Sequence, residues 1–383
     1  MSRQDKTSSS HSPSWVLRAI ALLLITGLAT ACTARTAPFM RWFPNPSDKA
    51  LCEASERALG KPTMLAAPET KQSVSALAFA PDGATLHVVH AGAPGMLIKW
   101  EVSAAPQVVQ QIALDKVGQR GVQFSAASNR LVVTAGRPDR RSSVNLLGTD
   151  LKGVQVWDVA SGKLLSHSMN EPDKKPPPTV WADAALSPAG DLVLVATPGG
   201  YLMDEVDSGK GRCSVLMITD EQVHEATAVA FDAKGETFAY GNANGDVELW
   251  RLGKEPGICP SVGGGVMGDH EEVIIRLAFH PTDNRYAVLS DRSLWIVRWP
   301  GFFLDRVKRI ERKSSALGDI KFSPDGRLLA VATPHGLEVR KYPSLDVVAS
   351  DAGISATAVA FSAANCTLAV GDSVGTVRLY ELR

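Results

Sequence analysis

The chain has 383 residues, of which 45% are hydrophobic, so it can bury a sizeable core. That length suits one large all-β domain better than a simple small domain. Its 40 basic and 40 acidic residues cancel, and this neutrality gives no reason to expect nucleic acid or an anionic membrane surface as a partner.

The N-terminal segment has the pattern of an export signal. Basic residues precede an apolar run at residues 19–25, and small residues follow this run up to Cys32. Such a short run is typical of a secretory signal, because a helix that spans a membrane needs about 20 apolar residues.

Cys32 lies directly after Ala31, and in this respect the segment resembles a bacterial lipoprotein signal. The resemblance implies that residues 1–31 are a signal peptide that is removed and that Cys32 is lipidated. Thr33, in place of an aspartate, then implies an outer-membrane lipoprotein on the periplasmic side of the cell envelope. An ordinary cleaved signal and an uncleaved anchor are the alternatives.

Residues 32–61 are predicted to form a tether and a short helix. The tether is rich in proline and small residues. Ser47 can cap a helix that runs to Leu59, and Gly60 can end it. We expect this helix to pack against the outside of the main domain.

A two-strand unit recurs seven times along the rest of the chain. In its clearest copy, an apolar strand ends at Phe322, the turn Ser-Pro-Asp-Gly follows at residues 323–326, and a second apolar strand covers residues 328–332. Proline fixes φ and glycine accepts positive φ, so these residues predict a tight turn. The period of roughly 40–45 residues between most copies is typical of four-stranded propeller blades.

A third strand follows each hairpin and often ends in an aromatic residue. We place these strands at residues 96–100, 154–157, 215–217, 247–250, 293–295, 337–339 and 377–380. Several of them alternate apolar and polar residues, as half-buried strands do.

These units resemble the repeats of WD-repeat β-propellers. Residues 244–250 (NGDVELW) and the dipeptide Trp157-Asp158 match the end of the repeat, and the Ser-Pro-Asp-Gly turns match its first hairpin. The resemblance covers residues 62–383 and implies an all-β, seven-bladed β-propeller of four-stranded antiparallel blades. The sequence departs from the family in having a single Trp-Asp dipeptide and in mostly lacking the Asp-His-Ser-Trp hydrogen-bond network.

The last blade has only three strands before the chain ends. Its outermost strand must come from elsewhere, because an unpaired sheet edge is a liability. We predict that residues 62–66 pair with residues 375–382 and close the ring.

The longest connections indicate where a partner would bind. In WD-repeat propellers, the loops from second to third strands share a face with the links between blades. We expect four such segments on one face, at residues 136–152, 169–179, 198–212 and 260–269. The charged residues proposed to bind a partner protein or peptide are Arg137, Arg140, Arg141, Lys174, Lys175, Asp204, Glu205, Asp207, Lys210 and Arg212.

The alternative is that these charged residues do not bind a partner. Arg140 and Arg141 can pair with the acidic residues across the loops, or all of them can be solvated, since exposed ion pairs contribute only ~0–1 kcal/mol. Residues 301–304 (GFFL) are a second candidate surface on the opposite face, where the two aromatic residues can also pack between blades.

Four cysteines follow Cys32, with spacing that fits no metal site. Cys52 can pair with Cys366, and Cys213 with Cys259, in an oxidising compartment. Four unpaired or buried thiols are the alternative.

Residues with catalytic potential are scattered. The sequence contains no nucleophile elbow, phosphate loop or zinc-protease motif, and we expect no cofactor and no metal site. We therefore expect a monomeric, non-enzymatic interaction scaffold. The alternative is a propeller hydrolase or lactonase with a metal site in the central channel, which Asp183, Arg276 and Asp319 could line.

Overall fold

The computed structural model describes most of the second half of the chain and parts of the first. The described residues are 59–65, 71–114, 117, 122–125, 129–134, 154–168, 183–197, 200–216, 218–219, 222–223, 226–257, 259–267, 272–299, 305–311, 318–365 and 367–382. The chain divides into two compact units, Met1–Asp48 and Lys49–Arg383, and every described residue belongs to the second. The predicted signal peptide, Cys32 and the body of the short helix lie outside the described residues.

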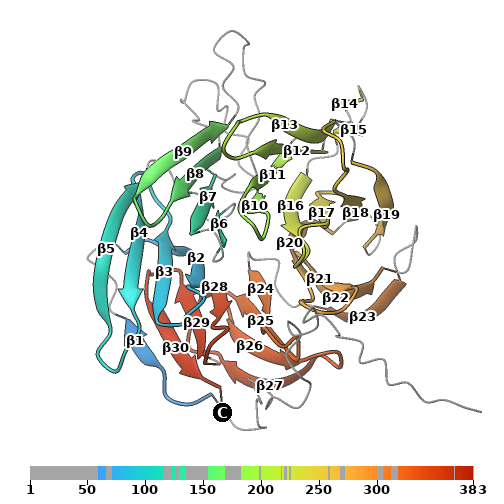
Figure 1. Cartoon of the computed structure of the whole chain (residues 1–383). Coiled ribbons are helices and arrows are strands. Elements are labelled where there is room, and N and C mark those ends of the chain that lie inside the picture. The colour runs from blue at the N-terminus through green and yellow to red at the C-terminus, as the bar shows by residue number, and fades with distance from the viewer. Residues whose placement is uncertain are drawn as a thin grey trace, which may run out of the picture. The chain divides into compact units, whose positions relative to one another are not determined.

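The second unit is a seven-bladed β-propeller, as predicted (Figure 1). Each blade is a four-stranded antiparallel sheet, and the first strand of each blade lies nearest the centre of the ring. None of the described residues is helical. In particular, none forms a helix that is long and apolar enough to cross a membrane.

The first four blades follow one another along the chain. Blade 1 contains β2 (Val74–Phe79), β3 (Thr85–His90), β4 (Gly95–Glu101) and β5 (Gln107–Leu114). Blade 2 contains β6 (Val122–Ser125), β7 (Arg130–Val133), β8 (Val154–Asp158) and β9 (Lys163–Ser168). Blade 3 contains β10 (Ala184–Leu186), β11 (Leu192–Thr197), β12 (Gly200–Glu205) and β13 (Gly211–Leu216). Blade 4 contains β16 (Ala226–Phe231), β17 (Thr237–Asn242), β18 (Asp246–Arg251) and β19 (Ser261–Val266).

Three further blades complete the ring. Blade 5 contains β20 (Ile274–Phe279), β21 (Arg285–Ser290), β22 (Ser293–Arg298) and β23 (Asp305–Glu311). Blade 6 contains β24 (Asp319–Phe322), β25 (Leu328–Thr333), β26 (Gly336–Lys341) and β27 (Asp346–Asp351). Blade 7 contains β28 (Ala356–Phe361), β29 (Thr367–Asp372), β30 (Val377–Glu381) and β1 (Thr63–Leu65). A small hairpin, β14 (Ile218–Thr219) and β15 (Gln222–Val223), lies between blades 3 and 4 in the sequence.

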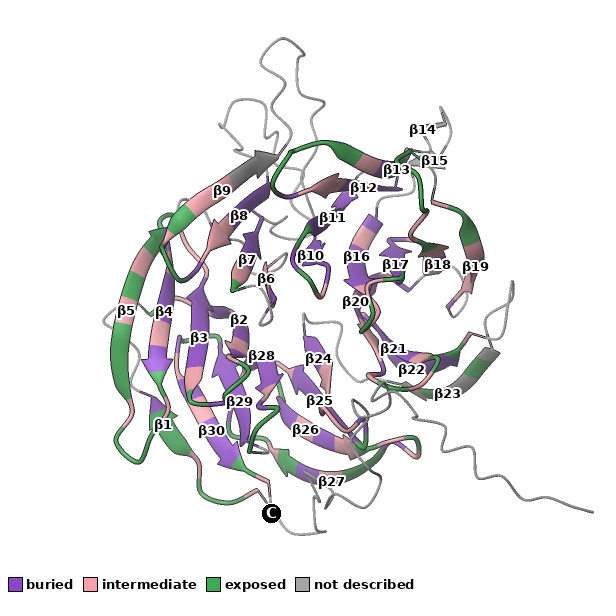
Figure 2. Cartoon of the chain, in the orientation of Figure 1, coloured by how far each residue is buried: buried purple, intermediate pink, exposed green. Residues whose placement is uncertain are grey.

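The hydrophobic core is divided among the interfaces between blades. The described residues form seven apolar clusters, and each cluster joins two neighbouring blades. In blade 1, for example, Leu86 and Val88 pack toward blade 7, whereas Val89 and Leu97 pack toward blade 2. A sheet that is covered on both faces needs continuous apolar strands, which is why all six residues of β17 and of β29 are buried. Figure 2 shows exposed residues along outer strands such as β5 and β27.

The turn between the first and second strands of blade 6 requires glycine. Gly326 has a φ of +74°, and a Cβ atom at this position would lie 2.3 Å from the imidazole of His280 in blade 5. The Ser-Pro-Asp-Gly turn therefore serves two purposes, because it reverses the chain and leaves room for the neighbouring blade.

The predicted ring closure is confirmed. Strand β1 pairs with β30 in an antiparallel arrangement that places Thr63 opposite Leu379 and Leu65 opposite Val377. Leu65 is 2% exposed and belongs to the apolar cluster between blades 7 and 1. The N-terminal strand thus completes the sheet that the C-terminal strands begin.

The predicted third strand of blade 3, residues 215–217, is wrong. The third strand is β12, and Val215 lies in the fourth strand, β13, opposite Tyr201. Gly200 lets β13 approach the start of β12 closely, because its φ is +143° and a Cβ atom there would lie 2.1 Å from the carbonyl oxygen of Val215. Residues 200–212 of the predicted insertion are therefore the third strand, the turn that follows it and the start of β13.

The predicted glycine-rich link at residues 260–269 is also largely wrong. Residues Ser261–Val266 form β19, the outer strand of blade 4, which pairs with β18. The glycines at 263–265 allow close approach to β18, since a Cβ atom on Gly264 would lie 3.2 Å from Cγ of Glu248. Glycine in this segment reflects close strand contact and not a loop.

Candidate functional site

The predicted partner-binding residues fall into two groups. Five of them, Arg137, Arg140, Arg141, Lys174 and Lys175, lie outside the described residues. The other five belong to the β12–β13 hairpin of blade 3: Asp204, Glu205, Asp207, Lys210 and Arg212.

The β12–β13 hairpin does not share a face with the β7–β8 connection. Strand direction alternates in an antiparallel blade, so the first-to-second and third-to-fourth connections lie on one face of the ring. The second-to-third connections and the links between blades lie on the other. Asp207 and Lys210 lie in a third-to-fourth turn, whereas residues 134–153 join the second strand of blade 2 to its third. The prediction that all these segments lie on one face is therefore wrong for residues 198–212.

Asp207 has a structural partner in the neighbouring blade. Its Oδ1 lies 2.8 Å from Nη2 of Arg130, and Nη1 of Arg130 donates to the carbonyl of Gly190 at 2.8 Å. The Asp207 side chain is 71% exposed, so this ion pair contributes only ~0–1 kcal/mol. Glu205 accepts a hydrogen bond from Ser208, and Lys210 is exposed.

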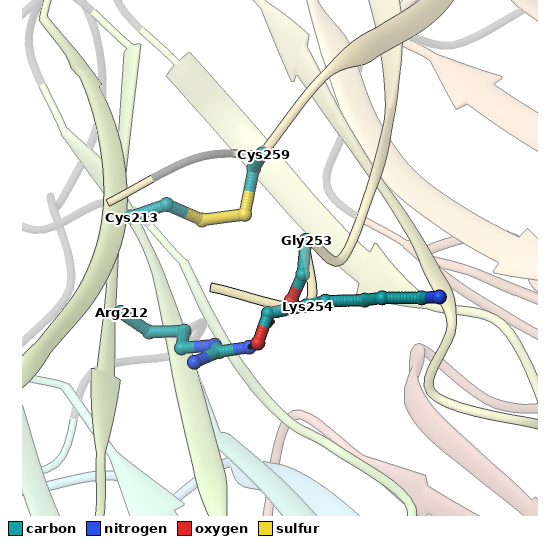
Figure 3. The surroundings of a disulfide bond; sticks show 5 residues. All are labelled: Arg212, Cys213, Gly253, Lys254 and Cys259. Atoms are coloured by element: carbon teal, nitrogen blue, oxygen red, sulfur yellow. Dashed lines mark hydrogen bonds between the residues drawn. A yellow bond between two sulfur atoms is a disulfide. The ribbon is translucent and has the colours of Figure 1, made fainter. Parts of the chain in front are cut away.

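Arg212 is engaged in a contact between blades 3 and 4 (Figure 3). Its guanidinium donates to the carbonyls of Gly253 and Lys254 in the β18–β19 connection. In return, the amide of Gly257 donates to the carbonyl of Arg212 at 2.6 Å. Arg212 is thus part of the framework that joins the outer strands of two blades.

The next residue along β13 forms a disulfide with the same connection. Cys213 and Cys259 are bonded with an S–S distance of 2.06 Å and a Cα–Cα distance of 6.0 Å (Figure 3). This pairing confirms one of the two predicted disulfides, whereas Cys52 and Cys366 lie outside the described residues.

Three charged residues meet near the centre of the ring. Nη1 of Arg276, on β20, lies 3.1 Å from Oδ1 of Asp183, which precedes β10. Nε of Arg276 lies 3.5 Å from Oδ1 of Asp319, at the start of β24. Asp183 is 5% exposed and Asp319 is 8% exposed. The residues named as possible channel-lining groups therefore form one buried ion-pair triad.

The triad also joins neighbouring blades through the backbone. Oδ2 of Asp183 accepts from the amide of Val229 in blade 4 at 3.1 Å, and Oδ2 of Asp319 accepts from the amide of Val359 in blade 7 at 3.2 Å. Buried carboxylates are costly unless they are neutralised and hydrogen-bonded, and here both conditions hold. The guanidinium of Arg276 pairs with both carboxylates and neutralises their charge.

The triad has a simple sequence signal. Each of its members stands three residues before the apolar residue that ends the first strand of its blade, namely Leu186, Phe279 and Phe322. In blades 4 and 7 the same position is Ala228 and Ala358. A charged residue three residues before the end of the first strand thus identifies the members of the ion-pair triad.

Blade 5 contains a buried polar network that the sequence did not reveal. Glu272 is 2% exposed and accepts from Ser290, Ser293 and Trp295, and its Oε1 lies 2.9 Å from Nη2 of Arg309. Glu272 precedes the first strand, so this network joins the start of blade 5 to its second, third and fourth strands. Neither this network nor any other group of three or more His, Cys, Asp or Glu side chains among the described residues could hold a metal ion.

The comparisons with known proteins leave the family open. No protein-family model matches this chain, and no curated protein matches it in sequence.

Proposed function

We propose that this chain is a non-enzymatic interaction scaffold of the WD-repeat type, tethered by a lipid to the periplasmic side of a bacterial cell envelope. A protein or peptide binds to the face that carries the β7–β8 and β9–β10 connections. The central triad carries this proposal, because Asp183, Arg276 and Asp319 pair with one another and both carboxylates also accept from backbone amides. Function in propellers is then left to the connections.

The disulfide supports the proposed location. Structural disulfides form and persist in oxidising compartments such as the bacterial periplasm. Cys213 and Cys259 join two blades, which is consistent with the export pattern and the cysteine at position 32. Lipidation of Cys32 would supply one membrane-attachment signal.

The WD-repeat assignment rests on local features of the blades. The tight Ser-Pro-Asp-Gly turn of blade 6, the Trp157-Asp158 pair at the end of β8 and the Glu272 network in blade 5 all fit such repeats. The alternative, a hydrolase or lactonase with a channel metal, needs carboxylates that are free to bind a cation. Arg276 already neutralises both central carboxylates.

Affinity capture from the native envelope tests the proposed partner face. The full chain is compared with a variant in which residues 136–152 are shortened to a four-residue turn. We expect the shortened variant to lose a partner that the full chain recovers. The matched control is Lys210→Ala on the opposite face, which should recover the partner as the wild type does. Unchanged recovery by the shortened variant, at an unchanged melting temperature, would discard the proposed binding face.

A further inference from the structure

One cross-strand pair has the same role in six of the seven blades. It joins the second and third strands, and both of its side chains face the next blade. Its second-strand residue comes directly after the one that pairs with the phenylalanine or leucine at or next to the end of the first strand. The pairs are Val132 with Val156, Leu194 with Met203, Ala239 with Leu249, Ala287 with Ile296, Ala330 with Val339, and Ala369 with Leu379. All twelve side chains are apolar, and none is more than 6% exposed. The position is therefore the middle of the apolar interface between blades.

Blade 1 places a histidine and a lysine at this position. His87 on β3 lies opposite Lys99 on β4, and both face blade 2. The imidazole is 4% exposed and stacks on Phe124 of blade 2, with ring centroids 4.5 Å apart. Polar groups in an apolar interface reduce stability, and departures of this kind are typical of functional sites.

A cavity of about 350 Å³ lies beside this pair. Its walls in blade 1 are His87, Lys99, Thr85 and the turn at residues 80–82, and its walls in blade 2 include Asn129 and the turn after β8. All of these turns lie on the face opposite the proposed partner-binding face. The volume matches a small organic molecule.

The polar groups of the cavity are suited to a particular ligand chemistry. The His87 ring hydrogen-bonds the backbone of Ala78, and its Nδ1 is buried without a partner among the described residues. A carbonyl can only accept, so Nε2–H is the donor, and Nδ1 of the neutral ring is left as an acceptor. The Lys99 ammonium has no ion-pair partner in the described part of the chain.

We infer that this cavity binds a small organic anion that carries hydroxyl groups. Lys99 holds the anionic group, which is a carboxylate or a phosphate. His87 accepts a hydrogen bond from a hydroxyl of the ligand at Nδ1, and Asp82 and Asn129 lie at the cavity wall. The inference concerns a different face from the proposed scaffold function and does not depend on it.

Thermal-shift titration of the full chain tests the inference. The probes are glycerate for the carboxylate, glycerol 3-phosphate for the phosphate, and glycerol as the uncharged control. We expect one or both anions to raise the melting temperature in a saturable way and glycerol to have no such effect. Lys99→Met should weaken anion binding by at least about tenfold. Lys234→Met, which removes an exposed lysine from a turn of blade 4, should bind as the wild type does.

A second variant separates binding from folding. His87→Ala with Lys99→Leu recreates the apolar pair that blades 4 and 7 contain. We expect this double variant to melt at a higher temperature than the wild type and to bind neither anion. The inference is overturned if neither anion shifts the wild type, if Lys99→Met binds as tightly as the wild type, or if the double variant is less stable.

Discussion

Arg276 of blade 5 neutralises two buried carboxylates, Asp183 in blade 3 and Asp319 in blade 6. Removing the guanidinium would leave Asp183 and Asp319 charged, buried and uncompensated. We expect Arg276→Met to lower the free energy of unfolding by about 3 kcal/mol or more. Denaturant unfolding at pH 7 measures this loss.

Two further variants give the controls for this prediction. Asp207→Asn breaks an ion pair whose carboxylate is 71% exposed, so it should cost no more than about 1 kcal/mol. Adding Asp183→Asn and Asp319→Asn to Arg276→Met should restore part of the lost stability, because the buried charges are then gone. Equal small losses for Arg276→Met and Asp207→Asn would show that the triad is not a buried electrostatic cluster.

The buried histidines make stability depend on pH. Burial, reinforced by the charge of Lys99, lowers the pKa of His87 to about 4, although Asp82 and the Ala78 carbonyl act in the opposite direction. Burial also lowers the pKa of His90 and of His280. The unfolded chain binds protons at these groups below about pH 6.5, while the folded protein resists protonation.

The free energy of unfolding should therefore be highest above pH 7 with respect to these histidines, and it should fall as the pH decreases from about 6.5 toward 4. His87 alone accounts for up to ~3 kcal/mol of this loss once the pH is below its folded pKa. Denaturant midpoints between pH 7.5 and 4.5 measure the slope. His87→Ala should flatten it, whereas replacement of the exposed His335 should not. A wild-type midpoint that does not change over this range would contradict the prediction.

Part of the central triad could be predicted from the sequence. Asp183, Arg276 and Asp319 stand at one level of the repeat, which pointed to the centre of the ring. Their mutual contacts could not be predicted, because they depend on distances between the first strands of different blades, which only the folded ring sets. Glu272 was missed because its partners Ser290 and Trp295 become neighbours only when blade 5 folds.

Strand β1 has three residues, and Leu65 is the one that is buried. Leu65 lies in the apolar cluster between blades 7 and 1, whereas Met64 is 51% exposed on the same strand. We expect Leu65→Ala to cost about 2–4 kcal/mol and Met64→Ala to cost no more than about 0.5 kcal/mol. Thermal and denaturant unfolding of the two variants give the comparison. Equal effects would mean that β1 does not close the ring through burial of Leu65.

The repeated elements explain why the fold was predictable. Residues 226–231 and 356–361 share the sequence ATAVAF and form equivalent first strands in blades 4 and 7. Thr227 donates to the carbonyl of Ile274 at 2.6 Å, and Thr357 donates to that of Val74 at 2.7 Å, so both threonines fasten the following blade. Because equivalent strands share residues in this way, the repeat period and the number of blades can be predicted from the sequence.

The strands predicted from the sequence were wrong where glycine could indicate either a turn or a close contact between strands. Residues 263–265 suggested a loop but lie in the outer strand β19, and Gly200 is the first residue of the third strand of blade 3, where it pairs with Thr197. Glycine marks close backbone contact as well as chain reversal, and the local sequence does not distinguish the two. The displaced strand assignment then placed Asp207 and Lys210 on the wrong face.

The proposed function of the propeller depends on export of the chain. A disulfide that joins blades 3 and 4 requires an oxidising compartment, and attachment of the ring to the envelope requires processing at Cys32. Formation of the disulfide and processing at Cys32 both change the covalent mass of the chain. Both changes can be measured in one sample, the chain produced in a bacterial envelope with its own N-terminal segment.

The intact mass of that chain, measured under non-reducing conditions, tests this directly. We predict a molecule that begins at Cys32, carries lipid on that residue, and gains two hydrogen atoms for the Cys213–Cys259 pair when it is reduced. A full-length, unlipidated chain whose mass does not change on reduction would contradict export, tethering and the disulfide together.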